Sequence, residues 1–445
     1  MIGGYDMKKE TKIQIALIFV LIIILGVVIY FAVINSSGSN SKNMGDPPSG
    51  SQKMMGNSDS SSVEATGATE INDTQTIENV SYTSSESDEN ALLIQNGGNA
   101  TLSNATITKT GDSDGENSDF YGTNAGILVS NNGNLTMGDS VVKTDASHAN
   151  GIFVYGTGVA TISDTKINTT SNNSGGVMVA GGGTLKGTNL TIQTEGNSSA
   201  AIRSDRGGGT MDITKGTYTT NGVGSPVIYS TADVTVNDAI LTSTKSEGVV
   251  VEGANSVTLN NVTLEDTNTT LNGNSTTYKN IFLYQSMSGD ADTGTANFTA
   301  KDSTIKTNKG DVFYITNTVA TINLTNNQFI NNNDGDFLRV EAAAWGKNGS
   351  NGGTVTLNSI KQEIIGNIII DNISTLDMKL TEGSYYEGTI NGDNSAKEIN
   401  ITLDKTSKIK LTGDIYVTSL TDEDSSYSNI DFNGYKLYVN GTSIN

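Results

Sequence analysis

A short apolar sequence returns every 25 residues in the middle of this chain. It reads Gly126–Val129 at its first clear occurrence, Gly151–Val154 at the next and Gly176–Val179 at the third. The repeat continues with looser spacing as far as Ile368–Ile370. A fixed period of this size is typical of a solenoid, in which each repeat adds one coil to a stack.

A single repeat contains three short segments with the alternation of β-strands. In residues 151–175 the predicted strands are 151–155, 159–162 and 166–169. The turn between the second and third strands carries Asn or Asp in most repeats, and both residues tolerate the left-handed backbone of a sharp corner. The corner positions are Asn104, Asp139, Asp164, Asn189, Asp238, Asn261, Asp302 and Asn326. We therefore expect an all-β fold, a right-handed parallel β-helix of about eleven three-strand coils.

With these features the chain resembles right-handed parallel β-helix proteins of the pectin lyase-like type. It is similar in particular to the adhesin-like exported surface proteins of anaerobic bacteria and methanogenic archaea. The likeness rests on the apolar repeats, the Asn and Asp corners, and the glycine-rich segments Ser204–Gly209 and Trp345–Gly353. It covers about residues 80 to 440. It implies the fold, but this architecture hosts lyases, hydrolases and non-catalytic surface proteins.

The N-terminal region predicts a membrane anchor. Residues 13–34 are apolar except for Gln14, which is long enough to span a bilayer as one transmembrane helix. Lys8, Lys9 and Lys12 precede this segment, so residues 1–12 are expected in the cytoplasm and the remainder outside the cell. A cleaved signal peptide is the alternative interpretation.

Three further regions follow the predicted anchor. Residues 35–75 are rich in Ser, Gly, Asn and Asp and are expected to form a flexible tether. The parallel β-helix is assigned to residues 76–398, where the strand pattern is regular. Residues 399–445 keep alternating strands but lose the regular spacing, so they are interpreted as terminal coils and a cap.

Charge and composition exclude several kinds of site. The chain of 445 residues has a formal net charge of −21, no cysteine and one histidine. The negative charge disfavours nucleic acid as a partner. The lack of cysteine excludes disulfides, thiolate metal sites and cysteine nucleophiles. A single imidazole does not make a zinc site of the usual histidine-rich kind.

The sequence contains no convincing catalytic cluster. The resemblance implies that a lyase would use calcium-binding acids with a basic Arg or Lys, and that a hydrolase would use clustered Asp residues. The best charged group is Arg203, Asp205 and Arg206, which are the candidate catalytic residues if the protein is an enzyme. The alternative for this group is a surface ion pair that contributes little. We therefore expect no catalytic residues.

One acidic loop has the spacing of a flexible calcium site. Asp112, Asp114, Glu116 and Asp119 place carboxylate oxygens close together within the segment 111–122. Ca²⁺ prefers such oxygen ligands, so it is the one cofactor that the sequence suggests. A solvated acidic loop with no metal is the alternative.

The first strand of each coil carries a second row of apolar residues. Its second position faces the core, so the next position should face outward, yet that position is apolar in all coils but one. The predicted outward row is Leu93, Leu128, Phe153, Met178, Arg203, Ile228, Val250, Phe282, Phe313, Leu338 and Ile369. A contiguous exposed apolar stripe marks a partner site, unless an inserted loop or the tail covers it. The predicted ligand-binding surface residues are Phe153, Tyr155, Met178, Phe282, Tyr284 and Phe313.

These observations give two functional hypotheses. The first is a membrane-tethered extracellular surface protein that is non-catalytic and binds a glycan or a cell-surface protein. The second is a polysaccharide lyase or glycoside hydrolase that acts on acidic glycans. Converging acids and arginines in one groove would favour the enzyme, and their absence would favour the binding protein.

Overall fold

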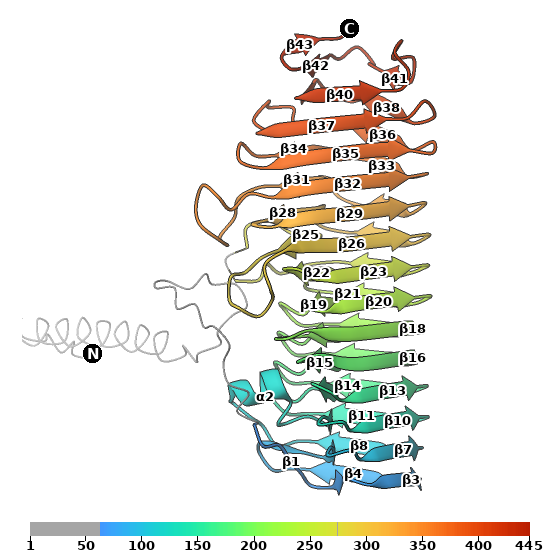
Figure 1. Cartoon of the computed structure of the whole chain (residues 1–445), viewed down its shortest axis with the longest axis vertical. Coiled ribbons are helices and arrows are strands. Elements are labelled where there is room, and N and C mark those ends of the chain that lie inside the picture. The colour runs from blue at the N-terminus through green and yellow to red at the C-terminus, as the bar shows by residue number, and fades with distance from the viewer. Residues whose placement is uncertain (1–62, 274) are drawn as a thin grey trace, which may run out of the picture. The chain divides into compact units, whose positions relative to one another are not determined.

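The protein folds as a parallel β-solenoid with almost no helix. The computed structural model describes residues 63–273 and 275–445, and its strands stack coil upon coil from the blue first coils to the red last coils (Figure 1). About 15 turns are present. The all-β, parallel and repetitive character predicted from the sequence is therefore confirmed.

One sheet collects the first strand of the coils, in chain order, and every pairing within it is parallel. Its twelve strands are β2 (Glu70–Ile71), β6 (Leu92–Ile94), β9 (Ile127–Val129), β12 (Ile152–Tyr155), β15 (Val177–Ala180), β17 (Ile202–Ser204), β19 (Ile228–Ser230), β22 (Val249–Glu252), β25 (Lys279–Tyr284), β28 (Asp311–Thr316), β31 (Leu338–Val340) and β34 (Ile368–Ile370). We call it the first-strand sheet. It carries the candidate site described below.

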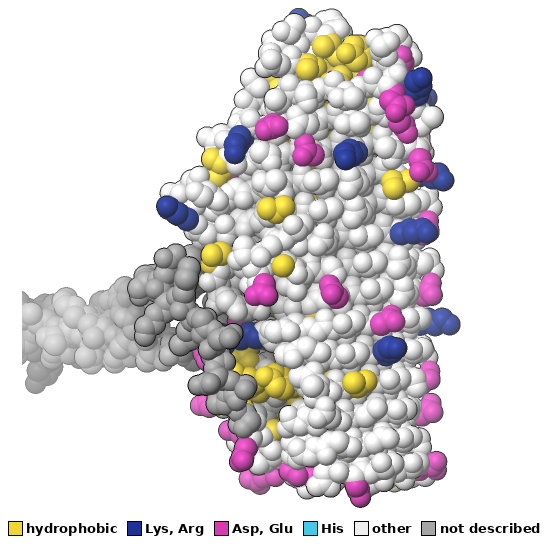
Figure 2. Space-filling view, viewed as in Figure 1, with side chains coloured by type: hydrophobic (Ala, Val, Ile, Leu, Met, Phe, Trp, Pro, Cys, Tyr) yellow, Lys and Arg dark blue, Asp and Glu magenta, His cyan; other side chains and the backbone are white. Residues whose placement is uncertain are grey.

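A second, 22-stranded sheet holds the second and third strands of the coils. Its strands are β3 (Thr74–Glu78), β4 (Ser81–Ser84), β7 (Asn99–Ser103), β8 (Thr106–Lys109), β10 (Asn134–Gly138), β11 (Val141–Thr144), β13 (Val159–Ser163), β14 (Lys166–Thr169), β16 (Gly183–Thr194), β18 (Gly209–Thr220), β20 (Asp233–Asn237), β21 (Ile240–Ser243), β23 (Ser256–Asn260), β24 (Thr263–Asp266), β26 (Thr295–Lys301), β27 (Thr304–Thr307), β29 (Val319–Thr325), β30 (Gln328–Asn331), β32 (Thr354–Ile360), β35 (Thr375–Thr381), β37 (Glu398–Leu403) and β40 (Ser419–Asp422). One face of the stack is largely polar, with charged side chains scattered over it (Figure 2).

The remaining strands lie at the ends of the stack and in its last coils. They are β1 (Thr66–Gly67), β5 (Glu89–Asn90), β33 (Glu363–Ile365), β36 (Tyr385–Gly388), β38 (Lys408–Leu411), β41 (Ile430–Asp431), β39 (Ile415–Val417), β42 (Leu437–Val439) and β43 (Thr442–Ser443). Strand β43 pairs antiparallel with β42 and ends the solenoid with a hairpin. Parallel coils thus continue through residues 399–445, and eleven coils is an underestimate, because the apolar repeat fades there while strand pairing persists.

The Asn and Asp corners adopt the backbone conformation expected of them. All eight predicted corner residues have positive φ, between 47° and 56°. Their side chains also bond from coil to coil: Asn104 Nδ2 donates to Asn79 Oδ1 at 2.6 Å, and Asn261 Nδ2 donates to Asp238 Oδ1 at 2.7 Å. The corners therefore form a hydrogen-bonded ladder along the stack, which fixes where the second strand ends and the third begins.

The N-terminal predictions fall largely outside the described residues. The anchor at 13–34, the segment 1–12 and most of the tether are not among them. Strands β1 and β2 begin at Thr66 and Glu70, within the segment assigned to the tether. In residues 63–273 and 275–445 no helix is both long and apolar enough to cross a bilayer.

Candidate functional site

The outward face of the first-strand sheet is one continuous ladder, but its register differs from the sequence prediction in three coils. Ile202 pairs with Ile228, so Tyr229 and not Ile228 follows Arg203 on the outside. In the same way Tyr314 and Arg339 lie outside in place of Phe313 and Leu338. The ladder consists of Leu93, Leu128, Phe153, Met178, Arg203, Tyr229, Val250, Phe282, Tyr314, Arg339 and Ile369.

Phe313 is therefore wrong as a surface residue. It is fully buried, and its ring packs edge-on against Phe298 and Phe337 with both centroid distances at 5.5 Å. Two coils are one residue longer than the sequence pattern predicts. Ile202 pairs with Ile228, 26 residues on, and Ile281 pairs with Phe313, 32 residues on. A slip of one residue moves a side chain to the other face of the strand.

The first half of the outward ladder is buried, with the loop 111–122 lying over Leu128 and Phe153 and Gly67 lying against Leu93. Leu93, Leu128, Phe153 and Met178 form a buried cluster of their own, separate from the solenoid core. The loop carries the short helix α2 (Glu116–Tyr121), which ends at Gly122. Phe153 and Met178 are 0% exposed, so neither offers a surface to a ligand.

The loop lies directly on these side chains. A Cβ atom added at Gly122 would come within 2.6 Å of Phe153 Cγ, so only glycine fits there. The Tyr121 ring packs edge-on against Tyr155, with 5.4 Å between the ring centroids. Of the two interpretations of the apolar ladder, cover by an inserted loop is the one observed in this half of the sheet.

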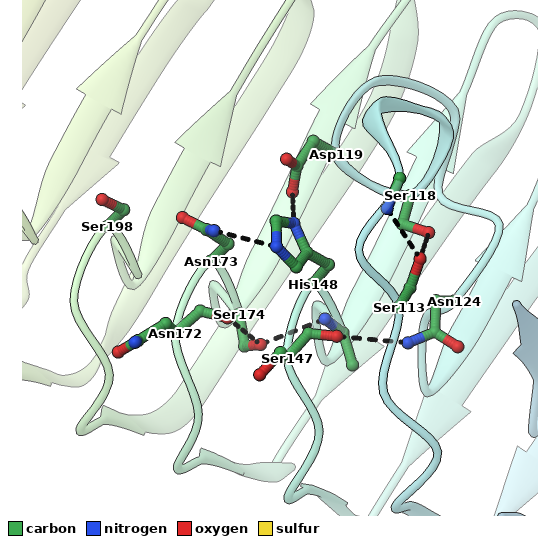
Figure 3. Close-up of polar contacts among 12 residues, drawn as sticks. Ser113, Ser118, Asp119, Asn124, Ser147, His148, Asn172, Asn173, Ser174 and Ser198 are labelled. Atoms are coloured by element: carbon green, nitrogen blue, oxygen red, sulfur yellow. Dashed lines mark hydrogen bonds and ion pairs between the residues drawn. The ribbon is translucent and has the colours of Figure 1, made fainter. Parts of the chain in front are cut away.

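The acidic residues of this loop serve to attach it. Asp112 accepts a hydrogen bond from the Ser147 amide at 2.7 Å, and Asp119 contacts His148 Nδ1 at 2.8 Å. His148 lies between Asp119 and Asn173 (Figure 3), whose Nδ2 is 3.1 Å from His148 Nε2. The imidazole of His148 thus joins the loop to the polar turn of the next coil.

The loop does not assemble the predicted calcium site. Asp114 and Glu116 are exposed, while Asp119 is engaged by His148. Within residues 63–273 and 275–445 no three His, Cys, Asp or Glu side chains are grouped closely enough to hold a metal ion. The alternating acids seen in the sequence therefore lie apart in the folded loop.

The charged group Arg203, Asp205 and Arg206 lies in the middle of the ladder. Arg203 and Asp205 are buried and form an ion pair of 3.2 Å. Burial raises the pKa of Asp205 to about 6, although the charge of Arg203 opposes that shift. Arg206 instead contacts Asp290 at 2.6 Å and lies over the Phe120 ring at 3.6 Å. The group thus links helix α2 to the loop 286–292.

The second half of the ladder opens into an aromatic cleft of about 330 Å³. Its lining comes from the outward face of β19, β22, β25 and β28, from Asn272, Ser275 and Thr276, and from residues 341–345. The Phe282 ring stacks on Tyr284 with 4.4 Å between centroids and 13° between planes. Tyr314 and Trp345 meet these two rings at angles of 61° and 53°. We call this the aromatic cleft.

A buried carboxyl fixes Tyr284 and a fifth ring of the cleft lining, Tyr229. Glu252 Oε2 accepts hydrogen bonds from the hydroxyl groups of Tyr229 at 2.5 Å and Tyr284 at 3.1 Å. Glu252 also contacts Ser286 Oγ. Burial raises the pKa of Glu252 and, to values well above the ordinary one, the pKa of Tyr229 and Tyr284. The network holds the rings in place before any ligand arrives.

Three charged side chains line the cleft. Lys279 Nζ lies 3.5 Å from Glu247 and 4.6 Å from the centre of the Phe282 ring. Glu341 accepts a hydrogen bond from the Tyr314 hydroxyl at 2.9 Å and is partly exposed. Aromatic faces flanked by a few polar groups are typical of small-molecule sites.

Sequence reasoning found part of this cleft. It named Phe282 and Tyr284 but missed Tyr229, Tyr314 and Lys279, because the last lies at the start of its strand and the others are displaced by one residue. It also missed Trp345, the only tryptophan of the chain. A lone tryptophan within an insertion was the available signal.

Two comparisons with known proteins were negative. A scan against protein-family models finds no match, and a search of curated proteins finds none either. The functional argument therefore rests on the geometry of the cleft.

Proposed function

We propose that this protein is a membrane-tethered, non-catalytic surface protein that binds glycans in the aromatic cleft of its solenoid. The single observation that supports the proposal is the set of rings Phe282, Tyr284, Tyr314 and Trp345 that line one cleft, in which Phe282 and Trp345 are partly exposed and Tyr284 and Tyr314 are buried against them. A sugar ring has an apolar face of C–H groups that packs on aromatic surfaces, and hydroxyl groups at its rim that bond to polar side chains. Residues 13–34 would anchor the chain in the membrane, and the solenoid would lie outside the cell.

The site also has the rigidity that favours binding. Two of its rings are held by Glu252, so little conformational entropy is lost when a ligand binds. The rings lie on strands of a regularly stacked sheet and on an insertion beside it. In solenoids such insertions often form the binding face. The resemblance to adhesin-like β-helix proteins agrees with this proposal.

The enzymatic alternative has weaker support. Arg203 and Asp205 are buried and paired with each other, and Arg206 is held by Asp290 and Phe120. A lyase base must reach the proton that it removes, and a hydrolase needs two carboxyl groups beside the scissile bond. Turnover of a polyuronate that is abolished by Asp205→Asn would favour the enzyme.

Tryptophan fluorescence tests the binding proposal. Because Trp345 is the only tryptophan and lines the cleft, a glycan that enters the cleft should change its emission. We expect the full chain in detergent to bind at least one member of a panel of neutral, amino and acidic oligosaccharides. Phe282→Ala should weaken that binding about tenfold or more, because a stacking surface is lost.

Tyr416→Ala is the matched control. Tyr416 stacks on Tyr438 with 4.7 Å between centroids, in the last coils and outside the cleft. This variant should bind like the parent. Absence of binding across the panel, or equal losses in the two variants, would contradict the proposal.

A further inference from the structure

The charges around the aromatic cleft point to a specific class of glycan. We infer that the cleft takes cationic amino sugars, such as glucosamine oligomers, in preference to uronates. This inference rests on the proposed glycan binding and adds the chemistry of the ligand. The argument for this preference depends on Lys279, on Glu341 and on the aromatic rings of the cleft.

The lysine of the cleft is not available to an anionic ligand. Lys279 Nζ donates hydrogen bonds to Ser275 Oγ at 2.6 Å and to the Thr277 carbonyl at 3.2 Å. It also lies 3.5 Å from Glu247, and its side chain is only 5% exposed. Two of the three ammonium donors are therefore used in hydrogen bonds, and the charge is paired with Glu247. A uronate carboxylate would have to displace these contacts.

Glu341, by contrast, is open to a ligand. Its side chain is 29% exposed. Oε1 accepts from the Tyr314 hydroxyl, and Oε2 lies 3.7 Å from Arg339. A carboxylate has about four acceptor positions, so Glu341 keeps room for a ligand ammonium. Arg339 only partly offsets this charge, because Asp311 and Asp336 contact it more closely, at 2.7 Å and 2.5 Å.

The balance of charge near the cleft is negative. Four carboxylates and two cations lie in or beside the cleft. The carboxylates are those of Glu247, Glu341, Asp311 and Asp336, and the cations are Lys279 and Arg339. The whole chain carries −21. Such a field attracts cationic ligands and repels polyanions.

The aromatic faces already hold one cation, which belongs to the protein itself. The protein's own Lys279 ammonium lies 4.6 Å from the centre of the Phe282 ring and 5.2 Å from that of Tyr314. The negative face of an aromatic ring attracts an ammonium group at such distances. An amino sugar that stacks in the cleft would present its apolar face to the rings and its ammonium to Glu341.

The test compares three oligosaccharides of equal length by Trp345 fluorescence. They are a glucosamine tetramer, its N-acetylated form and a galacturonate tetramer, each titrated into the full chain in detergent at mildly acidic pH. We expect the glucosamine tetramer to bind about tenfold more tightly than the galacturonate tetramer. Glu341→Gln should lower its affinity about tenfold and leave the N-acetylated form within about twofold.

Glu387→Gln is the matched control. Glu387 also accepts from a tyrosine hydroxyl, that of Tyr385 at 2.7 Å, and contacts a cation, Lys410 at 3.0 Å, but it lies outside the cleft. The parent affinities should persist in this variant. A tetralysine peptide should bind more weakly than the amino sugar.

The outcomes separate this inference from the proposed function. No binding of any oligosaccharide would overturn the proposed function. Tighter binding of galacturonate, or an unchanged affinity in Glu341→Gln, would overturn the amino-sugar inference and leave glycan binding in place. Equal binding of tetralysine would overturn it too, because the cleft would then recognise any cation.

Discussion

Asp266 ends strand β24 with its carboxyl group fully buried beneath the insertion that walls the aromatic cleft. Burial, together with the nearby charge of Glu247, raises the pKa of this carboxyl to about 9. An aspartate in the unfolded chain has a pKa of about 3.9. Between these values the folded state keeps a proton that the unfolded state has lost, so stability falls as the pH rises from about 4 to about 9.

Asp266→Asn should remove this loss. The amide cannot ionise, so the thermal midpoint of the variant should exceed that of the parent by about 2 °C or more at pH 8, and the gain should shrink toward pH 4. Thermal unfolding of the full chain followed by circular dichroism between pH 4 and pH 9 measures the difference. Asp302→Asn, at an exposed corner, is the control for the substitution itself. A gain that does not depend on pH would contradict the prediction.

The corner residues show what a single residue can reveal in a sequence. Asn and Asp at the turns were predicted from their tolerance of left-handed backbone, and their φ angles agree. Lys215, Lys361 and Glu382 also have positive φ at corners, although Lys and Glu have no preference for this conformation that a sequence could reveal. There the neighbouring coils impose the turn, which only the stacked structure shows.

At the scale of elements, the loop 111–122 determines which half of the ladder is available. Helix α2 and Gly122 close the half around Phe153, whereas the insertions at 266–280 and 342–353 flank the other half and leave it open. Gly122→Ala should displace the cover, because its φ of 72° disfavours a side chain and a Cβ would meet Phe153 at 2.6 Å. We expect faster proteolysis within 111–122 and more binding of a hydrophobic dye.

Gly156→Ala separates the clash from the backbone strain. Gly156 also has a positive φ of 62°, but no atom lies within 4 Å of an added Cβ. The Gly156→Ala variant should therefore lose only about 1 kcal/mol of its free energy of unfolding, because of backbone strain, and should not expose the apolar cluster. If both variants bind the dye equally, the loop is not held by its contact with Phe153.

The sequence predicted the strands of a regular coil but not the register of irregular ones. The strands expected over 159–162 and 166–169 correspond to β13 and β14. Coils with an additional residue displaced Tyr229 and Tyr314 from the predicted surface, since both faces of the strand are apolar there and the pattern cannot tell them apart. Cover by an inserted loop was one of the two predictions, but which loop covers which coils could not be predicted, because that depends on contacts between distant residues.

At the scale of the molecule, the stack of about 15 turns forms a single continuous core from Ile71 to Leu437. Only the neighbouring coil is needed to bury each new one, so terminal coils with weak sequence repeats still join the stack. For this reason the number of apolar repeats in the sequence is smaller than the number of turns in the structure. By the same logic we expect the solenoid to be independent of what precedes it in the chain.

This independence gives the prediction for the whole molecule. The full chain should remain with membranes after alkaline carbonate extraction, because residues 13–34 are apolar over the length of a bilayer core. A chain without residues 13–34 should be released while keeping the circular dichroism of the solenoid. Protease added to intact cells should cut before residue 63 and free the solenoid, since the lysines before the anchor favour a cytoplasmic N-terminus. Release of the full chain by carbonate, or protection of the solenoid until the cells are lysed, would contradict the anchored topology.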